Sequence, residues 1–215
     1  MTGVLGKTGL LLAVLALVAP VAGAQDTIGI YIEDDDGLDR AGVTKVGEPF
    51  DVVVVVNASK SGGAIEFVMT ELMHLFPGVF KFSTKKVNDT PLDLGNNQQG
   101  EYLIAYGGCV DAGSFEVVRL QYYDVDGSID DNVVLGLSGL GPESDYPSTF
   151  DGQMGYISCQ DEGVILVGEP WEHDDVIDPT RIEGVVNTDG IVVLNPVGLG
   201  VTNEEASVST LKTRF

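Results

Sequence analysis

Basic and metal-binding side chains are scarce in this chain of 215 residues. It carries 11 lysines and arginines against 33 acids, for a formal charge of −22, and has two histidines, two cysteines and one tryptophan. Phosphate binding needs clustered Lys and Arg, so nucleic acid and anionic membrane surfaces are poor partners for this chain. A structural zinc site normally needs four Cys or His ligands, which His74 and His173 do not supply.

The apolar stretch near the N-terminus is short for a membrane span of about 20 residues. It runs from Leu10 to Val18, with Lys7 before it and Ala22-Gly23-Ala24 after it. This order predicts a secretory signal peptide over residues 1–24, cleaved after Ala24, with a retained signal anchor as the alternative. We therefore expect a protein that is secreted, extracellular or associated with the cell envelope, with no membrane span after cleavage.

The two cysteines, Cys109 and Cys159, lie in or beside predicted strands. Export places them where disulfides persist, so we predict a bridge between them. Two small buried residues that never meet are the alternative. Neither cysteine has a nearby histidine or second cysteine, so the sequence indicates no redox or metal chemistry at either.

The fold prediction rests on the stretch from Gly47 to Ser59, which contains five consecutive valines. Branching at Cβ suits a pleated strand, and Pro49 stands at its start, where the missing N–H costs least. Val52, Val54 and Val56 would point to one face and Val53 and Val55 to the other. Because both faces are apolar, this strand is predicted to lie inside a sheet with its middle covered on two sides.

Further strands are predicted along the chain at Thr27–Ile32, Ala64–Thr70, Val79–Thr84, Tyr102–Tyr106, Phe115–Tyr123, Val133–Leu137, Tyr156–Cys159 and Val164–Val167, the last two as a hairpin. After Thr70 we favour a short helical turn or loop, although Phe67, Met69, Leu72, Met73 and Phe76 could also form one helical face. No convincing long helix separates the strands. The sequence therefore predicts an all-β fold, an antiparallel β-sandwich of jelly-roll or immunoglobulin-like type with an irregular C-terminal extension.

The predicted domain organisation has four parts. The signal peptide covers 1–24 and the β-sandwich domain 25–169; an acidic loop and a further β-hairpin follow over 170–199, and a C-terminal tail over 200–215. The hairpin would pair Glu183–Asn187 with Ile191–Leu194 around Thr188-Asp189-Gly190. The tail has charges ordered as in a short helix, which would be marginal alone.

Two acidic turns are the candidate metal sites. Asp34, Asp36 and Asp39 form one set, and Asp124, Asp126, Asp130 and Asp131 form the other. Calcium takes six to eight oxygen ligands, which clustered carboxylates on a glycine-containing turn can supply. Neither turn matches the EF-hand loop, and a solvated acidic turn is the alternative. Calcium is thus the one cofactor that the sequence suggests.

Residues 28–168 resemble the cohesin-like family of bacterial extracellular β-sandwiches, which is related in shape to carbohydrate-binding modules. The resemblance is carried by Phe50–Asn57, Gly62–Phe67, Val79–Val87 and Phe115–Leu120, in that order. It implies a sandwich that binds a partner module, or anchors enzymes to a polysaccharide-degrading surface complex. The chain differs from that family in its cysteine pair and its tail, and no binding residue is carried over.

Catalytic motifs are weak. Gly136-Leu137-Ser138-Gly139-Leu140 has Leu where a nucleophile elbow needs Gly. Tyr102, Tyr106, Tyr122, Tyr123, Tyr146 and Tyr156 could form a face that stacks on sugars, or simply line the sheets. We predict a non-catalytic binding or scaffolding module whose partner is an extracellular protein or polysaccharide. The alternatives are a structural surface protein stabilised by Ca²⁺ and an extracellular hydrolase.

Overall fold

A computed structural model describes residues 26–35, 37–88, 91–142, 144, 146–167 and 190–197. The predicted signal peptide, the tail and the acidic loop with His173 lie outside these residues. The strands are β1 (Thr27–Asp34), β2 (Gly37–Asp39), β3 (Ala41–Gly42), β4 (Pro49–Ala58), β5 (Gly62–Met69), β6 (Val79–Lys86), β7 (Leu92–Asp93), β8 (Glu101–Val110), β9 (Gly113–Asp124), β10 (Val133–Ser138), β11 (Gly155–Ser158), β12 (Val164–Leu166) and β13 (Ile191–Leu194); α1 is Leu72–Leu75.

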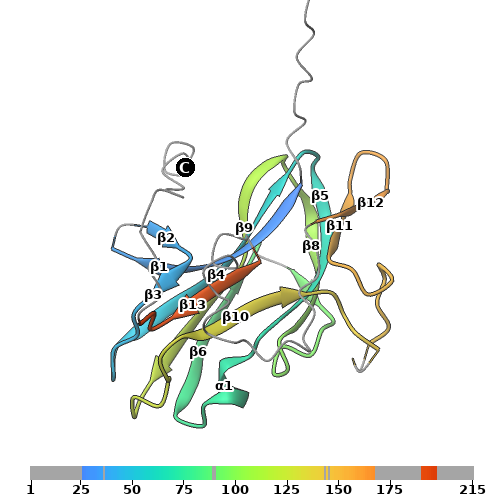
Figure 1. Cartoon of the computed structure of the whole chain (residues 1–215). Helices are drawn as coiled ribbons and strands as arrows, with labels where there is room; N and C mark the ends of the chain where they lie inside the picture. Colours follow the sequence, from blue (N-terminus) through green and yellow to red (C-terminus); the bar gives the residue numbers. More distant parts are fainter. Residues whose placement is uncertain are drawn as a thin grey trace, which may run out of the picture.

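Two sheets face each other and enclose one core, which confirms the predicted β-sandwich (Figure 1). The five-stranded sheet has the order β2-β1-β4-β9-β6. The eight-stranded sheet runs β12-β11-β5-β10-β13-β3, with β8 paired to β5 and β7 to β8. In the part of the chain that is described, no helix is long and apolar enough to cross a membrane.

Strand β4 lies in the middle of the five-stranded sheet, between β1 and β9. Val52, Val54 and Val56 point into the core between the sheets. Val53 and Val55 point the other way and pack with Tyr31 on the outer side, where none of the three is more than 6% exposed. The prediction of a strand covered on both sides is confirmed.

A single helical turn, α1, follows β5, as the sequence favoured. Glu71 caps it by accepting a hydrogen bond from the Met73 amide. The same carboxylate forms an ion pair with Lys81 of β6 and accepts a hydrogen bond of 3.0 Å from the Tyr122 hydroxyl. Because the Glu71 side chain is 1% exposed and that of Lys81 11%, this ion pair is buried.

Strand β13 belongs to the eight-stranded sheet. It lies beyond residue 169, where the sandwich domain was predicted to end. All four β13 residues are buried. The strand is antiparallel to β10 and parallel to β3 (Figure 1), so one pair departs from the antiparallel pattern. Ile191–Leu194 is a strand as predicted, but its predicted hairpin partner Glu183–Asn187 lies outside the described residues. The described sandwich therefore extends at least to Leu194.

Core tyrosines limit the stability of the fold at high pH. Tyr102, Tyr106 and Tyr122 are fully buried, and burial raises the pKa of each hydroxyl well above its usual value. The unfolded chain loses these protons first as pH rises, so stability falls above pH ~10 and is untouched by these groups below it. In an ultraviolet titration we expect these rings to ionise only as the protein unfolds. Ionisation of every tyrosine while the circular dichroism signal is intact would contradict this burial.

Candidate binding surface

A row of small and aliphatic side chains crosses the outer face of the eight-stranded sheet. Its five members, one from each strand in turn, are Val164 of β12, Ile157 of β11, Ala64 of β5, Ala105 of β8 and Leu92 of β7. Each is paired in register with the next, and paired residues project from the same face of a sheet. We call these five residues the apolar stripe.

The stripe points away from the core. One position along their strands, Tyr156, Ile65 and Ile104 point inward and are at most 2% exposed. Side chains alternate between the two faces, so the stripe residues face outward. Its ends are open to solvent, with Val164 49% and Leu92 58% exposed, while the three central residues are half-buried. The result is an apolar strip without a charged member, exposed at its two ends and half-buried at its centre.

One border of the stripe is formed by the loop after β10. The Ser148 hydroxyl and the Thr149 amide both donate hydrogen bonds to the Glu66 carboxylate, the second at 2.8 Å. Glu66 is 2% exposed and belongs to the next outward row of the sheet. The Phe150 ring lies over Gly155, where an added Cβ would be 3.0 Å from it. The loop is therefore fixed to the sheet face beside the stripe.

The other border is a disulfide. Cys109 and Cys159 are bonded, with their Cα atoms 6.1 Å apart, as the sequence predicted. The bridge crosses the outer face above Gly63, because a Cβ on Gly63 would lie 3.1 Å from the Cys159 Sγ atom. A side chain at Gly63 would press on the bridge, and one of the two would have to move by a few tenths of an ångström. The disulfide joins β8 to the end of β11, two of the strands that carry the stripe.

Charged side chains border the apolar stripe at the turn of the β11–β12 hairpin. The Lys60 ammonium lies 2.6 Å from a carboxylate oxygen of Asp161. The hydrogen bond from Lys60, with a second from Ser158, lowers the pKa of Asp161 to about 2. Asp161 is therefore ionised at neutral pH, and this end of the stripe has a charged rim.

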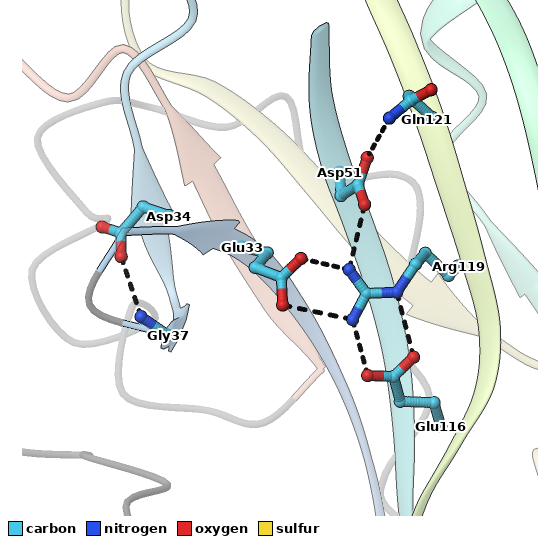
Figure 2. Close-up of polar contacts among 7 residues, drawn as sticks. All are labelled: Glu33, Asp34, Gly37, Asp51, Glu116, Arg119 and Gln121. Atoms are coloured by element: carbon cyan, nitrogen blue, oxygen red, sulfur yellow. Dashed lines mark hydrogen bonds and ion pairs between the residues drawn. The ribbon is translucent and has the colours of Figure 1, made fainter. Parts of the chain in front are cut away.

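The outer face of the five-stranded sheet has a different character (Figure 2). The Arg119 guanidinium forms ion pairs with Glu33, Asp51 and Glu116, at 2.9 Å to Asp51 and 2.6 Å to Glu116. Gln121 donates a further hydrogen bond to Asp51. Hydrogen bonds to Glu116 above all, and to Glu33 and Asp51, raise the pKa of Arg119. This cluster ties β1, β4 and β9 together, and its cation is already matched by three carboxylates.

At the first predicted metal site, on the turn between β1 and β2, the Asp34 carboxylate is engaged by a backbone amide of the same turn. An oxygen of Asp34 accepts a hydrogen bond of 3.1 Å from the Gly37 amide (Figure 2). Asp39 is half-buried on β2. Asp36 lies outside the described residues, so the complete set is not seen.

The second predicted site, after β9, is a turn organised by Asp124. This carboxylate is 2% exposed and accepts hydrogen bonds from three backbone amides, those of Gly127, Ser128 and Ile129, at 2.9, 3.1 and 3.3 Å. Asp126, Asp130 and Asp131 are exposed. No group of three or more acids, histidines or cysteines is placed to hold a metal ion within the described ranges. Calcium binding stays a prediction.

The predicted sugar-stacking face does not form, because most of its tyrosines point inward. Tyr102, Tyr106, Tyr122 and Tyr156 are fully buried, and Tyr123 is half-buried. Tyr146, at 40% exposure, is left without the others. Of the two interpretations, the one in which the tyrosines line the sheets agrees with the structure, and four of the six rings lie in the core.

Of the two histidines, the structure describes only His74. His74 is exposed in α1, and His173 lies outside the described residues. The hydrolase alternative needed a cleft that joins His173 to a pair of acids, so it stays a prediction.

No family model matches this chain, and no curated protein matches it either. The similar solved structures include cohesins. One is a cohesin module from a family 33 glycoside hydrolase of Clostridium perfringens, 10% identical, covering 80% of this chain and 97% of that chain at a TM-score of 0.43. A non-cellulosomal cohesin from the hyperthermophilic archaeon Archaeoglobus fulgidus is 14% identical, with 67% and 86% coverage and a TM-score of 0.42.

The seventh ScaB type I cohesin from Pseudobacteroides cellulosolvens is 9% identical to this chain. The match covers 80% of this chain and 92% of that chain, with a TM-score of 0.42. These three modules belong to the group that the sequence resembles, and the likeness is one of fold.

Sequence reasoning missed the apolar stripe and the Arg119 cluster. Each stripe residue stands in an ordinary strand pattern, and the surface arises only when five strands are placed in register. One feature of the sequence did point to Arg119: it lies at an outward position of a strand whose other face is apolar. Its partners on β1 and β4 could not be assigned without the register.

Proposed function

We propose that this chain is a non-catalytic binding module that docks a partner protein through the apolar stripe. The observation that carries the proposal is the row itself: five aliphatic side chains in cross-strand register on the outside of a chain with 33 acids. Contiguous exposed apolar area marks interaction surfaces. The centre of a protein interface is depleted of charge in the same way.

The stripe has its shape before a partner arrives. Its strands are hydrogen-bonded to one another, and the Cys109–Cys159 bridge and the Ser148–Glu66 contact fix its two borders. A surface that is already ordered loses little conformational entropy on binding. We propose a protein rather than a polysaccharide as partner because the stripe has no aromatic ring, the usual platform for a sugar face.

The module is proposed to act outside the cell or at its envelope. The disulfide supports this, since such bonds persist in oxidising compartments. The signal peptide predicted for residues 1–24 is consistent with the same route.

Photo-crosslinking from the stripe identifies the partner, and calorimetry then measures its affinity. A crosslinking amino acid at position 92 is expected to trap one protein from the host's surface fraction. With that protein purified, Leu92→Glu should weaken binding by about 30-fold or more, since a buried unpaired charge costs at least about 2 kcal/mol. Val125→Glu adds the same charge at a residue that is 54% exposed and off the stripe, and should stay within about threefold.

Two outcomes contradict the proposal. Equal weakening by both variants would mean general charge repulsion rather than docking on the stripe. Sedimentation of the purified chain as a dimer that Leu92→Glu dissociates would make a second copy the occupant.

A further inference from the structure

A hollow of about 310 Å³ lies at one end of the sandwich, away from the stripe residues. Its walls are the segment after β3, the turn between β9 and β10, and the residues that follow β13. The side chains that matter here are Val43, Val46, Val197, Asp124, Asp131 and Asn195. None belongs to the apolar stripe.

The walls are held together by Asn195. Its side-chain oxygen accepts a hydrogen bond of 2.8 Å from the Thr44 amide, and its nitrogen donates to the Ile129 carbonyl at 3.1 Å. Val46 packs against the turn between β9 and β10, because a Cβ at Gly127 would lie 2.7 Å from a methyl group of Val46. Three segments distant in sequence are thereby fixed around the hollow, so it is a built feature of the fold.

The rim combines exposed apolar area with negative charge. Val43, Val46 and Val197 are 72%, 62% and 57% exposed. Asp131 lines the hollow and is exposed, whereas Asp124 is occupied by the backbone amides of its turn. A ligand that satisfies both properties has an aliphatic body and a cationic end.

We propose that this hollow receives a lysine side chain presented by a partner. Its methylene stem would lie against the three valines, and its ammonium would remain partly hydrated beside Asp131, as long cationic side chains do at apolar surfaces. Arginine fits less well, since the described lining has no aromatic ring for a guanidinium to stack on. The net charge of −22 draws a cationic group toward the protein.

The test uses Nα-acetyl-L-lysine N-methylamide as the probe and the norleucine analogue, which lacks the ammonium, as its neutral match. Both are titrated into the ¹⁵N-labelled chain and followed by amide chemical shifts. We expect saturable shifts at Val43, Val46 and Gly127 with the lysine probe, and at least fivefold weaker shifts with the norleucine probe.

Paired variants assign the contact. Asp131→Asn should weaken the lysine probe about tenfold, while Asp130→Asn, which removes the same charge from a neighbouring acid outside the lining, should leave it within twofold. Val46→Ser should weaken both probes, and Val125→Ser neither.

Equal effects of Asp131→Asn and Asp130→Asn would reduce the binding to general electrostatics and overturn the proposal. So would shifts that do not map to the hollow. Loss of partner docking in Leu92→Glu with lysine binding intact would separate the two sites, because the probe does not touch the stripe.

Discussion

Lys81→Met is expected to lower the free energy of unfolding by about 3–5 kcal/mol, because it leaves a buried carboxylate without its cation. The Glu71 side chain is 1% exposed, and its remaining partners are the Tyr122 hydroxyl and the Met73 amide. Lys81 also donates to the carbonyl of Asn97 at 2.7 Å, so that acceptor loses its donor as well. Urea unfolding followed by tyrosine fluorescence and circular dichroism measures the change.

The control is a lysine in an exposed ion pair. Lys60→Met breaks the contact with Asp161, where both side chains are more than a third exposed, and should change the unfolding midpoint little. A second variant, Lys81→Met with Glu71→Leu, removes both charges and should recover much of the loss. If Lys81→Met unfolds at the same urea concentration as the wild type, the carboxylate is solvated and the buried pair does not exist.

Loss of the disulfide is expected to cost about 4 kcal/mol in the chain-entropy treatment of a closed loop of this length. Cys109 and Cys159 are 50 residues apart in sequence, so the bridge strongly restricts the unfolded chain. In a protein of this size, this corresponds to a fall in Tm of roughly 8–16 °C. Differential scanning calorimetry of the variant with both cysteines changed to alanine measures it.

Reduction of the wild-type disulfide with dithiothreitol is the matched control for the double-alanine variant. Wild-type protein in dithiothreitol should melt close to the double-alanine variant, and the variant itself should not respond to dithiothreitol. An unchanged Tm in both reduced wild type and variant would mean that the bridge holds together parts of the chain that stay close in the unfolded state.

The strands could be predicted from sequence because their signal is local. The valines of β4 and the alternation in β9 fix element type within a few residues, and Gln160-Asp161-Glu162-Gly163 marks the turn of the β11–β12 hairpin. The pairing of Cys109 with Cys159 required no register, since these are the only cysteines. Local pattern and cysteine count therefore give the fold class and the bridge.

The surfaces could not be predicted because they depend on register between strands. Bulges shift the pairing in β5 between Gly62 and Ala64 and in β6 between Lys81 and Ser83, and a shift of one residue exchanges the two faces. Alternation within β9 put Tyr122 on the same face as Val118 and Leu120, but the sequence left open whether the tyrosines stack on sugars or line the sheets. Burial of tyrosine and exposure of alanine and leucine are outcomes of pairing, not of composition.

The position of β13 sets the order in which the sandwich can be completed. Its neighbours β3 and β10 leave the ribosome long before Ile191–Leu194, yet each forms a ladder with that strand. Until the last part of the chain emerges, both keep unpaired backbone groups that could join a foreign strand. A chain that stops before residue 190 would lack the partner of both strands, so this part of the sheet cannot be completed until β13 has been made.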